Sequence, residues 1–150
     1  MATGIITEKS LRVFLMDKPE LNPLLGGLRW SPEDIEEACI NVIAYFNEST
    51  PATGRAYTVE NFPFRYCLTV GVAGYLLKSA SINEAVNELE YSAAGVSVQD
   101  KNKAPIFNQL GSAFWDEYKE IARGIKTNQY TSLLFGVGAS EYDRTPTNFW

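Results

Sequence analysis

Four carboxylates stand close together in the sequence and are the first candidates for chemistry: Glu33, Asp34, Glu36 and Glu37. Paired carboxylates can hold a metal ion or act as general acid and base. These four follow Ser31 and Pro32, a pair that is typical of a helix start. Acidic side chains in the first turn of a helix complement its dipole. The cluster is therefore interpreted as the solvated start of a helix and not as a catalytic pair.

The other residue types that carry catalysis lack partners in this sequence. Glu84 and Glu88 are four residues apart, but no histidine follows them at the spacing of a di-iron site. The chain contains no histidine at all, which removes the commonest general base and transition-metal ligand. Cys39 and Cys67 lie inside apolar helical patterns and are expected to be buried free thiols. We therefore predict a protein that is not an enzyme and that binds no cofactor or metal.

Composition and charge limit the class of partner. With 150 residues and 45% hydrophobic content, the chain is expected to form one sizeable core. Its formal net charge of −5 and the lack of a basic run argue against specific binding of nucleic acid or of an anionic membrane. The longest apolar stretch, 66–77, is shorter than the roughly 20 residues that cross a bilayer. Residues 1–16 lack the pattern of a secretory signal, so we expect synthesis in the cytoplasm.

Apolar periodicity predicts a mainly α fold, a bundle of about four to five helices. The expected helices cover residues 7–16, 31–47, 61–80, 81–90 and 105–126. The second of them carries one apolar stripe, which is expected to enter the core: Ile35, Ala38, Cys39, Val42, Ile43 and Phe46. Trp30, just before this helix, is expected to fold back on the body.

Two features of the central helix at 61–90 have a predicted structural cause. Gly71 and Gly74 lower helix propensity by about 1 kcal/mol each relative to alanine, so we expect another helix to approach closely there. Ser81 and Glu84 match a capping box, which predicts a kink or break before a shorter final segment. The apolar residues of that segment are expected to face inward: Ile82, Ala85, Val86 and Leu89.

A strand-like segment lies between two helical patterns, at residues 91–103. Gly95 and the alternation of Val96, Ser97 and Val98 disfavour a helix and favour an extended arm or hairpin near residues 92–100. An extended segment that projects from a helical body is suited to contact a neighbouring subunit. The alternative is an irregular connection without such a role. The candidate residues for the subunit interface are Val96, Ser97, Val98 and Gln99.

The last part of the chain is predicted to be an extended docking segment. We divide the chain into a helical domain at 1–126, which carries the arm at 91–103, and a C-terminal segment at 127–150. The segment lacks sustained periodicity, yet it is rich in aromatic residues, unlike most disordered tails. Its aromatic residues and its arginine are types favoured as interface anchors. The candidate docking residues are Phe135, Tyr142, Arg144, Phe149 and Trp150.

The order of several short motifs indicates a family. They are Pro19-Glu-Leu-Asn22, Ser31-Pro-Glu-Asp-Ile35, Tyr45-Phe-Asn-Glu48, Tyr57-Thr-Val-Glu-Asn-Phe-Pro63, Tyr91-Ser-Ala-Ala-Gly-Val-Ser-Val98 and Gly136-Val-Gly-Ala-Ser-Glu-Tyr142. Together they resemble the neck proteins of tailed bacteriophages, the head-to-tail connector or adaptor class that attaches beneath the portal. The resemblance covers roughly residues 8–142 and contains no catalytic signature.

The resemblance implies a structural virion protein that forms a ring, commonly dodecameric, around the DNA exit channel. Its expected partners are further copies of itself, the portal protein, and a tail or second neck protein. Genomic DNA would pass through the ring without specific binding, and no membrane is involved. The expected location is the virion neck, between head and tail. Two alternatives stay open: a tail-side completion protein, and a small helical ligand-binding or regulatory protein with a pocket near Trp30 and Tyr66.

Overall fold

The computed structural model describes residues 6–22, 27–86, 90–93, 96–99 and 103–136. Its elements, in chain order, are α1 (Glu8–Phe14), the 3₁₀ helix η1 (Pro19–Leu21), α2 (Pro32–Glu48), α3 (Arg65–Val86), β1 (Glu90–Ala93), β2 (Val96–Gln99) and α4 (Ala104–Phe135). The described residues thus hold four α-helices, and the mainly α fold predicted from the sequence is confirmed.

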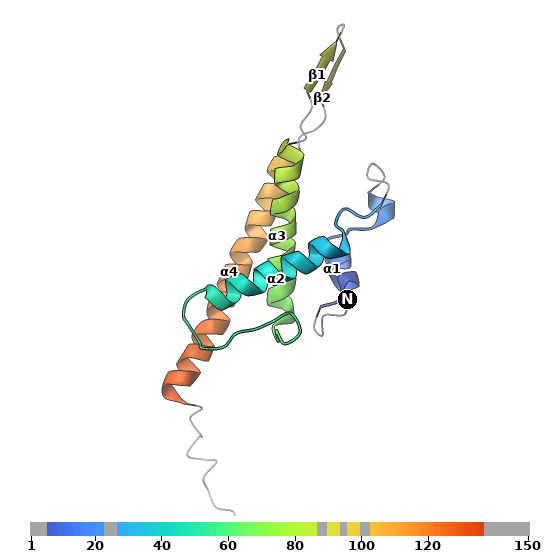
Figure 1. Ribbon diagram of the computed structural model, residues 1–150. Coiled ribbons are helices and arrows are strands. Elements are labelled where there is room, and N and C mark those ends of the chain that lie inside the picture. Colours follow the sequence, from blue (N-terminus) through green and yellow to red (C-terminus); the bar gives the residue numbers. More distant parts are fainter. Residues whose placement is uncertain (1–5, 23–26, 87–89, 94–95, 100–102, 137–150) are drawn as a thin grey trace, which may run out of the picture.

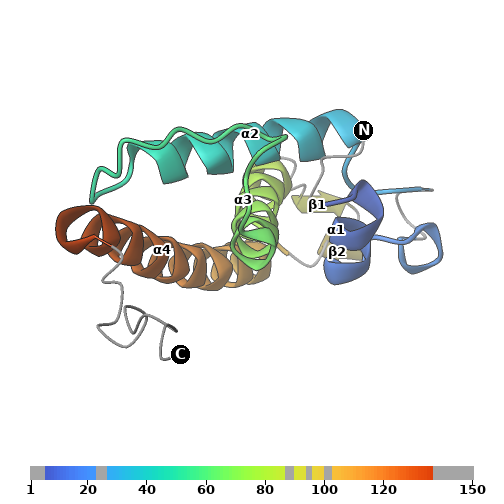
Figure 2. The same ribbon diagram turned by 90° about the horizontal axis from the view of Figure 1, so that it is seen from below.

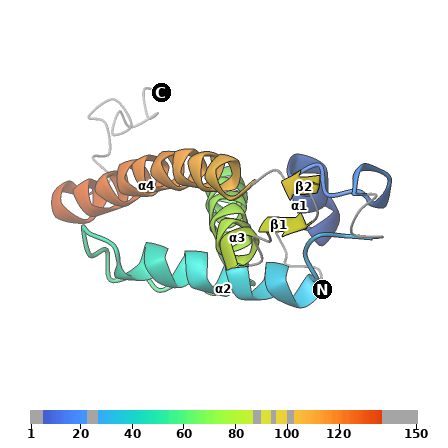
Figure 3. The same cartoon turned by 90° about the horizontal axis from the view of Figure 1, so that it is seen from above.

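The long axis of the molecule is the antiparallel pair of α3 and α4 (Figure 1). Helix α2 crosses this pair, and α1 lies near the N-terminal end of α2 (Figure 1). The views from below and from above both show α3 between α2 on one side and α4 on the other (Figures 2 and 3). The core lies where the three long helices meet, and α3 is the central element, as its nearly uniform apolar sequence predicts.

Glycines set the closeness of α3 and α4. A β-carbon on Gly74 would lie 2.8 Å from the backbone nitrogen of Trp115, and one on Gly111 would lie 2.9 Å from that of Lys78. A β-carbon on Gly71 would lie 2.6 Å from Cγ1 of Val42 in α2. The close helix approach predicted at Gly71 and Gly74 is therefore confirmed. The two helices touch backbone to backbone because no side chain stands between them.

Helix α2 forms as its sequence predicts. The hydroxyl of Ser31 accepts a hydrogen bond from the Asp34 amide (3.1 Å), and the Asp34 carboxylate accepts one from the Ser31 amide (2.8 Å). This reciprocal capping box fixes the first turn. All six residues of the predicted apolar stripe are buried. The carboxylate of Asp34 in the acidic cluster thus has a local structural role.

The predicted break at Ser81 is wrong, because α3 continues without interruption to Val86. The Ser81 hydroxyl is not a cap: it donates a hydrogen bond to the Lys78 carbonyl (2.8 Å) inside the helix. In the continuous helix Ile82 and Val86 face solvent, with 65% and 78% of their surface exposed, and Ala85 is exposed too. The inward orientation predicted for these residues is therefore wrong; Leu89 lies outside the described residues.

The end of the last helix also differs from its prediction. Helix α4 does not stop near Lys126 but extends to Phe135, and Gly136 follows with a φ of 68°, in the left-handed region. The pattern of buried apolar residues ends at Ile125 because most residues after Lys126 face solvent, while the helix itself continues. Residues 127–135, predicted as part of an extended segment, are therefore helical.

Candidate functional site

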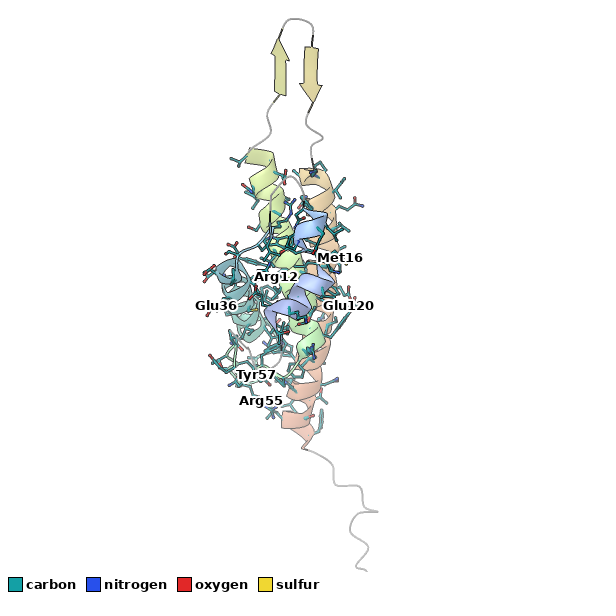
Figure 4. All side chains as sticks on the ribbon, turned by 90° about the vertical axis from the view of Figure 1, so that its right-hand side faces the viewer. Arg12, Met16, Glu36, Arg55, Tyr57 and Glu120 are labelled. Carbon is teal, nitrogen blue, oxygen red and sulfur yellow. The ribbon has the colours of Figure 1, made fainter. Side chains whose placement is uncertain are left out.

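The predicted arm coincides with a two-stranded antiparallel hairpin. In its register Val96 lies opposite Ala93 and Val98 lies opposite Tyr91. The hairpin stands beyond the C-terminal end of α3 and the N-terminal end of α4 (Figures 1 and 4). The four candidate interface residues make up the whole of β2. Their side chains lie outside what the structure describes, so their contacts stay a prediction.

Exposed apolar side chains surround the end of the body that carries the hairpin. They are Ile82 and Val86 on α3, and Ile106 and Leu110 on α4. Isolated exposed apolar residues are ordinary on a protein surface, but a group at one end indicates a contact surface. The sequence prediction missed this group because it assigned both residues of α3 to the core. Helical spacing alone does not show which apolar face of such a helix is covered.

The opposite end of the body is the tip of α4. Residues 127–135 carry no charged side chain. Four large apolar side chains are exposed there: Tyr130, Leu133, Leu134 and Phe135. Phe135, a predicted docking residue, is 80% exposed at the last position of the helix. The other four predicted docking residues lie outside the described part of the chain.

A buried lysine joins the tip of α4 to the end of α2. Lys126 is only 1% exposed, and its ammonium donates hydrogen bonds to the carbonyls of Phe46 (2.8 Å), Asn47 (3.3 Å) and Ser49. The carbonyls of Phe46 and Asn47 belong to the last turn of α2, where no further helical amide is available, and that of Ser49 belongs to the C-cap residue. Burial lowers the pKa of Lys126, whereas the three carbonyls favour its charged form. Sequence analysis missed this role, since a lysine near a helix end usually points to solvent.

A buried carboxylate orders the N-terminal region at the hairpin end. Asp17 accepts hydrogen bonds from the Arg12 guanidinium (2.6 Å), the Asn22 amide group (2.7 Å) and the Arg29 backbone amide (2.8 Å). The side chain of Arg29 then reaches Glu84 of α3 (3.1 Å) and lies 4.8 Å from the centre of the Phe107 ring of α4. The N-terminal loop is thus fixed to both helices of the central pair.

The described residues do not converge on a reactive group. Burial raises the pKa of Cys39 to about 11, with a smaller contribution from the charge of Glu36, and burial raises that of Cys67 to about 12. Both thiols are therefore protonated at neutral pH, and a thiol is a poor nucleophile. In the described ranges, no three acidic, histidine or cysteine side chains are placed to hold a metal ion.

We expect both thiols to resist modification in the folded protein. At pH 8 a thiol-specific chromogenic reagent should react roughly 100-fold more slowly with the native chain than with the chain in denaturant, because the thiolate is scarce and buried. The pKa of each thiol is higher in the folded chain than in the unfolded chain. Burial of the two protonated thiols therefore contributes fully to stability at a pH below the unfolded pKa. This contribution is lost as the pH rises toward 11 and 12. Rapid native-state labelling at pH 8 would contradict the burial.

Trp30 and Tyr66 have different surroundings in the described structure. Trp30 is buried, and the exposed Tyr66 donates a hydrogen bond from its hydroxyl to Glu117 (2.8 Å). Neither residue lines the cavities of about 830, 260, 460 and 520 Å³ on the described surface.

Family models, curated proteins and solved structures give no match to this chain. Over the described ranges, none of the helices combines the length and the apolar character that a bilayer crossing needs. The structural feature that bears most on function is a pair of exposed apolar surfaces, one at each end of the body that α3 and α4 form.

Proposed function

We propose that this chain is a structural protein of a tailed phage neck, which forms a ring that joins the portal to the tail and lets DNA pass. The resemblance of its motifs supplies the class. The observation that carries the proposal is the tip of α4, an uncharged helix end with four large apolar side chains in solvent. Such a surface is unfavourable in a protein that works alone, because it leaves apolar area in water.

The distribution of charge agrees with a subunit around a DNA channel. Helix α2 carries five carboxylates and no lysine or arginine: Glu33, Asp34, Glu36, Glu37 and Glu48. Tight DNA binding requires lysine and arginine side chains that neutralise phosphates. A ring that lines its channel with surfaces of this kind would let the genome slide.

The hairpin supplies the proposed contact between subunits. We assign Val96, Ser97, Val98 and Gln99 of β2 to an adjacent subunit or a tail component, and Phe135, Tyr142, Arg144, Phe149 and Trp150 to the portal. A two-stranded hairpin has two free edges, which favour pairing with another chain. Twelve copies would close the ring in the neck of the virion.

The test is a chain that ends at Gly136. It keeps all of α4, so its helical content should match that of the full chain. Its attachment to purified portal should fall at least about tenfold, a loss of roughly 1.4 kcal/mol, because it keeps Phe135 but lacks the other four docking residues: Tyr142, Arg144, Phe149 and Trp150. Co-sedimentation with portal particles measures this attachment.

The double variant Val96→Asp, Val98→Asp is the control for this experiment. It adds charge to β2 and leaves the C-terminal segment intact, so it should attach to the portal yet form fewer complete rings in electron micrographs. Normal attachment of the chain that ends at Gly136 would refute the proposed docking. A label on the protein seen at the tail side, away from the portal, would instead favour the tail-side completion protein.

A further inference from the structure

Two adjoining cavities lie along α2 and α4, and residues of α3 line much of the second; together we call them the α2–α4 groove. A cavity of about 830 Å³ and one of about 460 Å³ share Tyr45 as a lining residue. One wall carries three residues of α2 at spacings of four and three: Asn41, Tyr45 and Glu48. The other wall carries three residues of α4 at spacings of four: Trp115, Lys119 and Arg123. This spacing places each set on one helix face. The groove is therefore a linear surface and not a closed pocket.

The groove has an aromatic end and a cationic end. At the aromatic end the rings of Tyr45 and Trp115 meet edge to face at 5.2 Å, and Tyr75 and Ile82 extend the apolar lining. The Lys78 ammonium lies 5.8 Å from the centre of the Trp115 ring. Aromatic grooves of this kind bind extended peptides that present aromatic or proline side chains.

The charged groups of the groove favour a carboxylate-bearing peptide. Lys78, Lys119 and Arg123 line the groove, against one lining carboxylate, Glu48. Lys119 also contacts Asp116 at 2.7 Å, a pair at the surface that leaves Lys119 partly available. Arg123 is exposed where it lines the groove, so its guanidinium is available to a ligand. The lining thus has an excess of positive charge in a protein whose net charge is −5.

We propose that the α2–α4 groove binds residues 137–150 of the same chain. This segment contains three aromatic residues, Tyr142, Phe149 and Trp150, which match the aromatic end of the groove. It also carries two carboxylates against one arginine, which matches the excess of cations: Glu141, Asp143 and Arg144.

The segment is long enough to reach. Along α4, Trp115 lies about 32 Å from Gly136, at a rise of 1.5 Å per residue. Fourteen extended residues span at most about 46 Å. The segment can therefore turn back at Gly136, enter the groove beside Thr127 and bring Phe149 and Trp150 to Trp115.

This inference goes beyond the neck function and does not depend on it. In a neck protein, however, the same aromatic residues would serve two surfaces in turn. The free subunit would keep them on its own groove, and portal binding would have to draw them away. The groove would then prevent the exposed aromatics from associating before the correct partner is met.

Disulfide trapping in the full chain tests the proposal. Ser79→Cys places a thiol on an exposed position of the groove, and Asn148→Cys places one beside the aromatic residues of the segment. Under mild oxidation, the double variant should form an intramolecular disulfide at the monomer mass, because bound residues bring the thiols within bonding range. The native Cys39 and Cys67 are buried and should stay reduced.

The matched control pairs Asn148→Cys with Ala113→Cys, an exposed position of α4 two residues from Trp115 and therefore on the opposite face. We expect cross-linking to be at least about tenfold faster with Ser79→Cys. Adding Lys119→Glu and Arg123→Glu should remove most of that difference. Equal rates in the two pairs would overturn the proposal. A disulfide-linked dimer as the main product would overturn it too, because the segment would then occupy a neighbouring copy.

Discussion

Replacing Gly74 by alanine should lower the free energy of unfolding by about 3 kcal/mol, the largest effect expected from a single methyl group in this protein. The added β-carbon would lie 2.8 Å from the backbone nitrogen of Trp115 and 3.1 Å from the carbonyl oxygen of Gly111. Both atoms are backbone and cannot turn away as a side chain does. The α3–α4 pair would have to separate, and packing along its length would loosen. Chemical denaturation monitored by circular dichroism measures the change.

Gly124→Ala is the matched control, because Gly124 lies in α4 and a β-carbon there would meet nothing within 4 Å. At this open position alanine should stabilise the chain by about 0.5 to 1 kcal/mol through its higher helix propensity. The two substitutions are chemically identical and should therefore have opposite signs. A Gly74→Ala protein as stable as the parent would show that α3 and α4 do not touch backbone to backbone.

Replacing Lys126 by methionine should cost about 3 kcal/mol, the second large effect. Methionine fills similar space but leaves the carbonyls of Phe46, Asn47 and Ser49 without their donor. Buried carbonyls that lose a charged partner retain their full desolvation penalty. The melting temperature should fall, and amide exchange should become faster in the last turn of α2 before other regions.

Lys119→Met controls for the loss of a positive charge in the same helix. The Lys119 side chain is exposed and pairs with Asp116 over 2.7 Å, an arrangement worth less than about 1 kcal/mol. This variant should unfold within about 0.5 kcal/mol of the parent. If the two methionine variants were equally stable, the hydrogen bonds from Lys126 to the end of α2 would contribute nothing to the free energy of unfolding.

The sequence was most informative where local chemistry decides the structure. Ser31 and Asp34 cap α2 through atoms three residues apart, and the buried stripe of that helix follows from one period. Gly71 and Gly74 correctly predicted that neighbouring helices approach α3 closely, because two glycines in an apolar helix need a compensating contact. These signals are all contained within a few turns of one helix.

The sequence was least informative where a distant contact decides the structure. The capping signal at Ser81 is real but weak, and packing of α3 on α4 overrides it, so the helix continues. Lys126 is buried only because the end of α2 arrives there, about 80 residues away in the sequence. No periodic pattern contains that information.

The candidate surfaces were predicted in part. The sequence singled out β2 and Phe135; the structure places β2 beyond one end of the α3–α4 pair and Phe135 at the last position of α4, toward the other end. It did not single out Ile82 and Val86, because exposed and buried apolar residues look alike in a helix that is apolar on most sides. Tyr142, Arg144, Phe149 and Trp150 lie outside the described residues, and their docking stays a prediction.

Helix α4 has a mechanical consequence. It is unbroken over 32 residues, a length of about 47 Å, and the glycine contacts clamp its first half against α3. It has no proline or bulge after Pro105 that could act as a joint. Because α4 is a single rigid helix, a displacement of its exposed tip should also move its other end, which carries the hairpin. If both ends bind partners as proposed, an event at one end would tilt the other, and the layers on either side would move together.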